Sequence, residues 1–273
     1  MQKNHRKIFF YTALPSEAKP IVDYFRLKKD TRFTPFAIYA NDDVCLTVTG
    51  IGKNAMSAGV AYTQALFSSD SNQVFLNIGI AGHRSHTLGS LFLAHKITDF
   101  ESQRIHYPPI IFKPPCPTDS LQTSVRPQLN YDHPHLCDME ASAFYETAAR
   151  FTSGEFIQCL KVISDNAEIP AENINAKQVS ALIAEHLPAF NLVIDEMKSL
   201  TNLVATSEPA LLNDLKQSFR FTTSEQIQLK NQLSRWAVAT NNQPIEINKA
   251  GLKTGREVLA WINQHLQKLD FSL

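Results

Sequence analysis

Four acidic side chains stand at places in the sequence where they could act on a ligand. Asp138 and Glu140 flank Met139 at the start of an apolar helical pattern, in the stretch LCDMEASAF. Glu17 follows the first apolar run of the chain, and Asp165 follows a later one. Carboxylates can accept hydrogen bonds from ligand hydroxyls and exchange protons with a reacting group. Each of them also fits an acid in the first turn of a helix or a turn cap, so the elements around them must decide.

Five apolar runs predict buried strands that alternate with helices. The runs cover residues 7–14, 44–49, 74–78, 90–97 and 156–163. Such alternation predicts an α/β sheet with helices on both faces, in which ligands bind beyond the carboxyl ends of the strands. The turns at these ends hold Glu17, Gly52, Gly82 and Asp165. The sequence therefore predicts that glycines and carboxylates from separate segments meet at one edge of the sheet.

The remaining segments divide the chain into two parts. Residues 100–136 are rich in proline and predict one short strand at 120–125, followed by the helix that Asp138 opens and a long helix over 175–200. Beyond residue 201 the pattern predicts helices only. We therefore expect one domain over residues 1–200 and a helical C-terminal extension over 201–273. The extension could be packed on the domain, mediate oligomerisation or bind a partner.

Composition excludes several classes of protein. The chain has 273 residues, 44% of them hydrophobic, and a formal net charge of +0, so we expect a globular protein with neither nucleic acid nor membrane as partner. Its four cysteines form no CxxC pair, which predicts free thiols and no metal site. No apolar run approaches the roughly 18 to 20 residues of a membrane span, and the short run at 8–14 lacks a signal-peptide cleavage site. We expect a cytoplasmic protein.

Five motifs resemble one superfamily in their order and context: TALPSEAKPI, VTGIGKNAMSAG, NIGIAGH, CDMEASAF and LKVISDNAE. They are similar to motifs of the nucleoside phosphorylase and nucleosidase superfamily, most closely those of its 5′-methylthioadenosine/S-adenosylhomocysteine nucleosidase branch. The most specific part is MEA on a helix, followed about 25 residues later by a strand that ends in SD. The resemblance implies a three-layer phosphorylase-like fold, in which helices flank a central mixed sheet.

The resemblance also implies roles for residues within these motifs. Asp165 would act as general acid at a ring nitrogen of a purine, Glu17 would activate water, and Glu140 would accept hydrogen bonds from ribose hydroxyls. Breaking an N-glycosidic bond needs such groups, because the base leaves with negative charge while the sugar becomes positive. Asp138 receives no role and is interpreted as a helix-start acid. The other implied substrate-binding residues are Met139, Ile51, Ile80, Ala81, Gly82 and Ser164.

The expected activity is hydrolysis of a purine nucleoside or thionucleoside to free base and sugar, by a homodimer without a metal or organic cofactor. Two alternatives stay open: a phosphate-dependent phosphorylase, and an inactive nucleoside-binding protein whose tail binds a partner. Hydrolysis is favoured because Asn77 stands where a phosphorylase arginine is expected, although Arg84 and Arg126 could supply charge. Three residues are candidates for the aromatic side chain that stacks on the base in this family: Tyr107, Phe112 and Tyr131.

Overall fold

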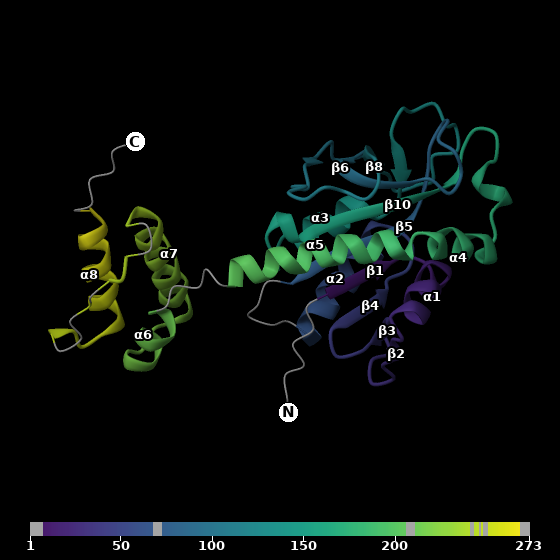
Figure 1. The fold of residues 1–273 in the computed structure, drawn as a ribbon. Helices are drawn as coiled ribbons and strands as arrows, with labels where there is room; N and C mark the ends of the chain where they lie inside the picture. Colours follow the sequence, from purple (N-terminus) through teal and green to yellow (C-terminus); the bar gives the residue numbers. More distant parts are fainter. Residues whose placement is uncertain are drawn as a thin grey trace. The chain divides into compact units, whose positions relative to one another are not determined.

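The structure is a computed structural model that describes residues 8–67, 73–205, 211–240, 243–245, 247 and 251–267. The chain forms two compact units, Met1–Thr201 and Asn202–Leu273. The first unit holds a sheet with its covering helices, and the described elements of the second are helical (Figure 1).

A mixed sheet forms the centre of the first unit. Its strands, in spatial order, are β10 (Ile157–Asp165), β6 (Leu91–Asp99), β8 (Thr118–Thr123), β9 (Leu136–Asp138), β5 (Val74–Gly82), β1 (Ile8–Thr12), β4 (Val44–Val48), β3 (Ala37–Ala40) and β2 (Lys28–Lys29), with β7 (Ile105–His106) paired to β6. β5 also pairs with β10, so β4, β1, β5 and β10 run parallel as neighbours. β6 runs antiparallel to β10 and parallel to β8. The predicted mixed sheet is confirmed.

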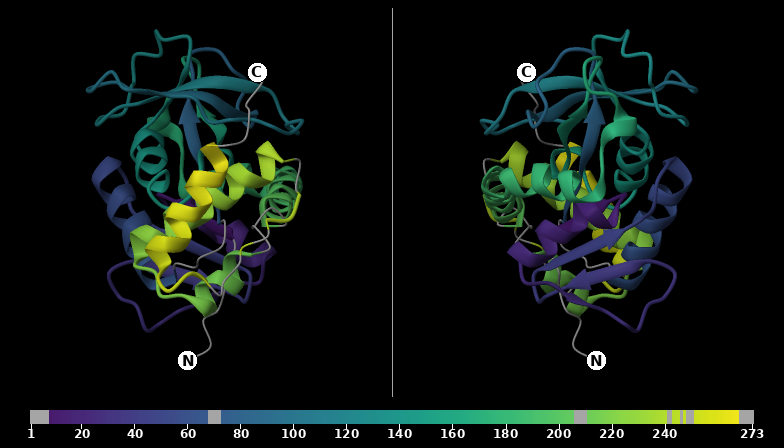
Figure 2. Two further views of the ribbon diagram at one scale, coloured as in Figure 1. Left: turned by 90° about the vertical axis from the view of Figure 1, so that its left-hand side faces the viewer. Right: turned by 90° about the vertical axis from the view of Figure 1, so that its right-hand side faces the viewer.

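Helices cover both faces of this sheet, because side chains alternate along each strand. In β1, Ile8 and Phe10 belong to one core cluster, whereas Phe9 and Tyr11 belong to the other. The first face is covered by α1 (Pro15–Tyr24), α4 (Ala176–Glu185) and α5 (Leu187–Ala205), and the second by α2 (Lys53–Phe67) and α3 (Ala141–Ala148). In Figure 2, α2 (dark blue) and α3 (teal) lie on one side of the strands and α5 (green) on the other. The result is the predicted three-layer arrangement.

β5 is longer than the sequence predicts. The apolar run over 74–78 predicts a strand that ends at a glycine turn, but the strand continues to Gly82. β10 pairs with it along this stretch, with Gly79 opposite Lys161 and Ala81 opposite Ile163. The predicted turn is therefore wrong, because pairing with a neighbouring strand overrides the weak strand propensity of glycine.

Three further boundaries differ from the predictions. Asp138 does not open a helix, since it ends strand β9 and α3 begins at Ala141. The helix predicted over 175–200 is two helices that meet at His186. Pro188, in the first turn of α5, has no N–H with which to continue the preceding helix. The strand predicted at 120–125 lies two residues earlier, as β8.

The second unit contains α6 (Leu212–Ser218), α7 (Thr223–Ala239) and α8 (Gly255–Gln267). Thr222 and Glu225 cap α7 reciprocally, with N–H to side-chain oxygen distances of 2.8 and 3.3 Å. The apolar side chains share one core, formed by Leu212, Leu215, Leu229, Leu233, Ile245, Val258, Leu259, Ile262 and Leu266. A helical extension is confirmed, whereas its role, the homodimer and the cytoplasmic location stay predictions. Within the described ranges, no helix combines the length and apolar character needed to cross a bilayer.

Candidate active site

The first unit contains a cavity of about 310 Å³ at the carboxyl ends of its central strands. This volume fits a small-molecule ligand. The nine residues predicted to act on or bind a substrate all line it: Glu17, Ile51, Ile80, Ala81, Gly82, Met139, Glu140, Ser164 and Asp165. The wall also holds residues that the sequence analysis did not select, namely Ala13, Leu14, Pro127, Gln128, Leu129, Cys137, Asp138 and Ala171. The structure thus brings the predicted residues together, while their roles stay predictions.

Glu17 is a buried carboxylate with a fixed orientation. Two backbone N–H groups of the turn before it donate to Oε2, each at 2.9 Å, and the Ile80 N–H donates to Oε1 at 3.0 Å. Burial raises the pKa of Glu17, while Lys161 and these hydrogen bonds oppose the rise. Gly79 permits the close approach of the side chain, since a Cβ at that position would lie 2.8 Å from Oε1. Glu17 is therefore held at the cavity wall with N–H donors on both of its oxygens.

Glu140 immediately precedes α3 and reaches the glycine turn after β4. Its Oε1 accepts a hydrogen bond from the Gly52 N–H at 2.7 Å. Gly52 has a φ of 96°, a left-handed conformation that favours glycine. Burial and the neighbouring Asp138 raise the pKa of Glu140 to about 7, although Lys161 acts in the opposite direction. Its carboxyl group therefore changes ionisation near neutral pH.

Lys161 is the main residue of this site that the sequence analysis missed. It lies in the middle of β10 with its side chain 1% exposed, and its Nζ forms an ion pair with Asp138 Oδ2 at 2.8 Å. Because side chains alternate along a strand, Lys161 shares the face of Cys159 and Ile163, on which α3 packs. Burial alone would lower the pKa of Lys161, but Asp138 and Glu140 raise it above its ordinary value. The ammonium group therefore stays charged among the carboxylates.

Asp138, the last residue of β9, connects several neighbouring segments through its carboxylate. Its Oδ2 accepts hydrogen bonds from both Lys161 and the Ala141 N–H, the latter at 2.9 Å. Its Oδ1 accepts the Thr123 hydroxyl at 2.7 Å. These bonds join β8, β10 and the start of α3. They hold the two residues that follow Asp138 at the cavity wall.

Asp165 ends β10, and both of its carboxylate oxygens accept hydrogen bonds. The Ser164 hydroxyl donates to Oδ1, and the Tyr131 phenol donates to Oδ2 at 2.7 Å. The adjacent strand β5 requires glycine at position 82, since a Cβ there would lie 2.6 Å from Oδ2 of Asp165. Among the three aromatic candidates, Tyr131 therefore contacts a residue of the cavity wall, although it is not itself one of the lining residues. Tyr107 is 64% exposed, and Phe112 packs against the core on the α5 face.

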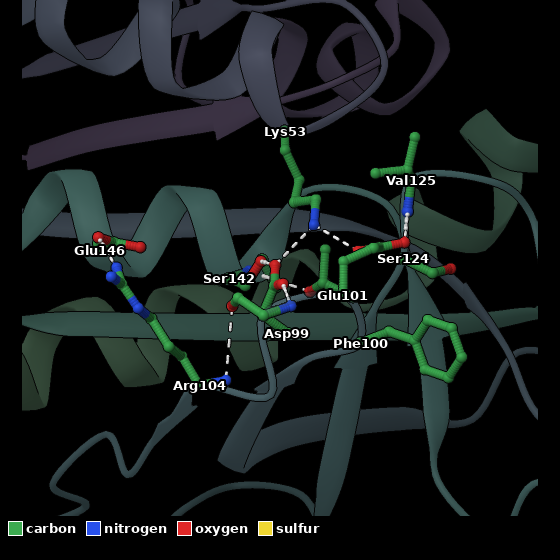
Figure 3. A network of polar contacts seen from close by, with 12 residues as sticks. Lys53, Asp99, Phe100, Glu101, Arg104, Ser124, Val125, Ser142 and Glu146 are labelled. Atoms are coloured by element: carbon green, nitrogen blue, oxygen red, sulfur yellow. Dashed lines mark hydrogen bonds and ion pairs between the residues drawn. The ribbon is translucent and has the colours of Figure 1, made fainter.

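A second polar network holds the glycine turn after β4 in place (Figure 3). Lys53, the first residue of α2, contacts Asp99 at 2.7 Å and Glu101 at 2.5 Å. Ser142 of α3 donates to the same Asp99 oxygen at 2.7 Å. Burial acts to raise the pKa of Asp99, but the Lys53 ammonium and the hydrogen bonds outweigh it and lower that pKa. Since Lys53 directly follows Gly52, this network fixes the N–H that Glu140 accepts.

The charged side chains among the described lining residues are all acidic. Four carboxylic acids line the cavity, and none of the described lining residues carries a cationic side chain. Cys137 also lines it, but burial raises the pKa of its thiol to about 12, so it is not a thiolate nucleophile at neutral pH. The arrangement suits a ligand that develops positive charge.

One group in the described part of the chain has the composition of a metal site: His83, His86 and Asp119 place one ligand atom each within 4.8 Å of the others. His83 Nδ1 already accepts the N–H groups of Ser85 and His86, at 3.1 and 2.9 Å. His86 Nε2 contacts Asp119 Oδ2 at 2.8 Å. These hydrogen bonds already engage the side chains of the group, and they connect the loop that follows β5 with β8.

Comparisons with solved structures reveal nucleosidases of similar fold. The apo 5′-methylthioadenosine nucleosidase of Arabidopsis thaliana superposes with a TM-score of 0.57 and 16% identity, over 70% of this chain and 96% of that one. The 5′-methylthioadenosine/S-adenosyl homocysteine nucleosidase of Campylobacter jejuni superposes with a TM-score of 0.54 and 16% identity, over 70% of this chain and 99% of that one. The Helicobacter pylori nucleosidase with butyl-thio-DADMe-Immucillin-A superposes with a TM-score of 0.52 and 14% identity, over 70% of this chain and 98% of that one.

No protein-family model and no curated protein matches the chain by sequence. At the identities of the solved structures, likeness establishes the fold alone. The predicted nucleoside phosphorylase and nucleosidase fold is therefore confirmed.

Proposed function

We propose that this chain, which has the nucleoside phosphorylase and nucleosidase fold, hydrolyses the N-glycosidic bond of a purine nucleoside or thionucleoside to free base and sugar. The observation that carries the proposal is the convergence of Glu17, Glu140 and Asp165 on one cavity whose described lining is acidic. Such a lining stabilises the positive charge that develops on the sugar. The nucleosidases of similar fold support this choice of reaction.

In the proposed reaction Asp165, Glu17 and Glu140 each have one role. As the bond between C1′ and the base breaks, its electron pair moves to the base, and Asp165 transfers a proton to a ring nitrogen. Water attacks C1′, and the proton that it loses passes to Glu17. Asp165 loses one proton and Glu17 gains one, so exchange with solvent restores both. Glu140 accepts hydrogen bonds from ribose hydroxyls and so holds the sugar beside the attacking water.

The site favours water over phosphate as the nucleophile. Phosphate recognition commonly uses arginine in bidentate pairs, but Arg84 and Arg126 are exposed and do not line the cavity. The Asn77 amide donates to the Tyr11 carbonyl at 3.0 Å. The buried ammonium of Lys161 is already paired with a carboxylate. A phosphate ion would therefore face carboxylates without a compensating charge.

Release of free base from a panel of nucleosides tests the proposal. Methylthioadenosine, S-adenosylhomocysteine, adenosine and inosine are incubated with the full chain, with and without phosphate, and the products are separated by chromatography. We expect release from at least one of them without phosphate, with free sugar as the second product. Release that requires phosphate would instead indicate a phosphorylase. Binding without release would contradict the proposal and indicate an inactive nucleoside-binding protein.

Nucleoside affinity should increase as the pH rises through neutrality. The pKa of Glu140 is raised to about 7 by burial and by Asp138, so its carboxyl group is mostly neutral below that pH and ionised above it. An ionised carboxylate accepts ribose hydroxyls more strongly, which predicts about fivefold tighter binding at high pH. Calorimetry on Asp165→Asn, which should bind without turnover, measures this dependence.

Glu140→Gln in the same background is the matched control. Its amide oxygen can still accept from the Gly52 N–H, which Glu140 contacts at 2.7 Å, but the amide does not titrate. The pH dependence should therefore disappear in that variant. Glu17 faces the same cavity and also has a raised pKa, so a dependence that persists without Glu140 would assign the effect to Glu17.

A further inference from the structure

The phenol of Tyr131 lies between two residues of the cavity wall. Its hydroxyl donates to Asp165 Oδ2 at 2.7 Å and accepts the Ala171 N–H at 2.9 Å. Tyr131 has a φ of 49°, a left-handed conformation that bulky residues rarely adopt. Residues 127–129, shortly before it, line the same cavity. The chain is thus bent so that one hydroxyl lies beside the proposed acid.

In this arrangement side-chain hydroxyls occupy both oxygens of the Asp165 carboxyl group. Ser164 donates to one oxygen and Tyr131 to the other. A general acid must instead carry a proton when the bond breaks. A substrate that draws one donor away would leave one oxygen of Asp165 free to carry that proton. The phenol can do this, because its hydrogen turns about the C–O bond while the Ala171 N–H keeps the oxygen in place.

Purine bases differ in the hydrogen-bonding group at the 6 position, next to N7. Guanine presents two acceptors, N7 and O6, and other 6-oxopurines share this edge, whereas adenine presents the acceptor N7 and the N6 amino donor. A 6-oxopurine can accept the Tyr131 hydroxyl at O6 and a proton from Asp165 at N7. Adenine offers no acceptor at its 6 position, and the phenol oxygen already accepts from Ala171. The hydroxyl and the acid together complement the edge of a 6-oxopurine.

We infer that Tyr131 selects 6-oxopurine nucleosides and prepares Asp165 for proton transfer by moving its hydrogen bond from the carboxylate to O6. The inference rests on the proposed function and names the substrate class of that site. The hydroxyl hydrogen stays on Tyr131, and the proton that reaches N7 is one that Asp165 takes up from water. Burial and the bond to Asp165 raise the pKa of Tyr131 to about 12, so the phenol remains a donor throughout the neutral range.

The binding of free bases measures this selectivity in the absence of turnover. Calorimetry compares hypoxanthine with adenine on the full chain. We expect hypoxanthine to bind about tenfold more tightly, as one additional hydrogen bond in a buried site allows. Tyr131→Phe keeps the ring and removes the hydroxyl, so the two bases should then bind about equally. Tyr107→Phe is the matched control, since Tyr107 is 64% exposed and its loss should change neither affinity.

Turnover of inosine and adenosine provides the second measurement. Tyr131→Phe should lower kcat/KM for inosine about tenfold and leave that for adenosine nearly unchanged. A merely structural role, in which Tyr131 only ties its segment to Ala171, would lower both values together and also lower the thermal midpoint. That result would overturn the inference.

Four outcomes of the binding measurement also decide the matter. Adenine binding as tightly as hypoxanthine to the native chain, or binding of neither base, overturns the inference. So does a preference for hypoxanthine that survives Tyr131→Phe. A preference that disappears in that variant supports the inference even if neither nucleoside releases its base, in which case the proposed function alone fails.

Discussion

Asp165→Asn is expected to release base about 10²- to 10⁴-fold more slowly than the native chain. Asparagine has the same shape, and its oxygen can accept one of the hydroxyls that contact Asp165, those of Tyr131 and Ser164. The amide cannot give up a proton at neutral pH, so the base must leave as an anion. The loss should therefore appear in kcat, with a much smaller change in KM. Chromatographic assay of base release at several substrate concentrations separates the two.

A leaving group that needs no protonation tests the reason for this loss. With 4-nitrophenyl riboside, whose phenolate is a stable anion, Asp165→Asn should retain most of the native rate. Asp23→Asn is the surface control, because Asp23 is exposed on α1 beside Lys19. Equal losses with the purine nucleoside and with the nitrophenyl riboside would contradict the assignment of Asp165 as the acid and indicate a positional role.

The convergence of the carboxylates could be predicted because it depends on local patterns. The apolar runs that became β1, β5 and β10 are continuous, and parallel strands bring their carboxyl ends to the same edge. Glu17 follows the first of these ends and Asp165 terminates the last. Neither placement requires knowledge of distant contacts beyond the order of the strands.

The sequence also contains a signal for the buried Lys161. Lys161 is the single charged residue in the run over 156–163, in which Gln158 is the other polar residue. Lysine is almost never fully buried unless it is paired. A lysine in a strand that must be buried on both faces therefore predicts a carboxylate partner, which the structure shows to be Asp138 at 2.8 Å.

The region before α3 could not be predicted, because long-range contacts place it. β9 has three residues and pairs with β8 in parallel, with Leu121 opposite Leu136. Such a strand is too short for a periodic pattern. Tyr131 reaches Asp165 across 34 positions of sequence. Three aromatic residues were candidates for the site, and only tertiary structure distinguishes Tyr131 from the other two.

Lys161→Met is expected to destabilise the first unit by about 3 to 5 kcal/mol. Methionine retains most of the length and apolar character of the lysine stem, but it leaves Asp138 buried without its counter-charge. Urea unfolding followed by far-UV circular dichroism measures the change. Both tryptophans, Trp236 and Trp261, lie in the second unit, so their fluorescence reports the unfolding of that unit separately.

The pH dependence of this penalty separates lost charge from lost volume. Burial raises the pKa of Glu17 and of Glu140, so these groups contribute stability that is present at acid pH and lost as the pH rises through their folded-state values. Removing the ammonium raises those values further, and protonated carboxyls no longer need a counter-charge. The destabilisation should therefore be smaller at about pH 5 than at about pH 8, and Asp138→Asn combined with Lys161→Met should recover part of it. A penalty that is equal at both pH values and unchanged by Asp138→Asn would instead indicate a packing defect. In that case the carboxylates of the cavity would not depend on Lys161 for their charge balance.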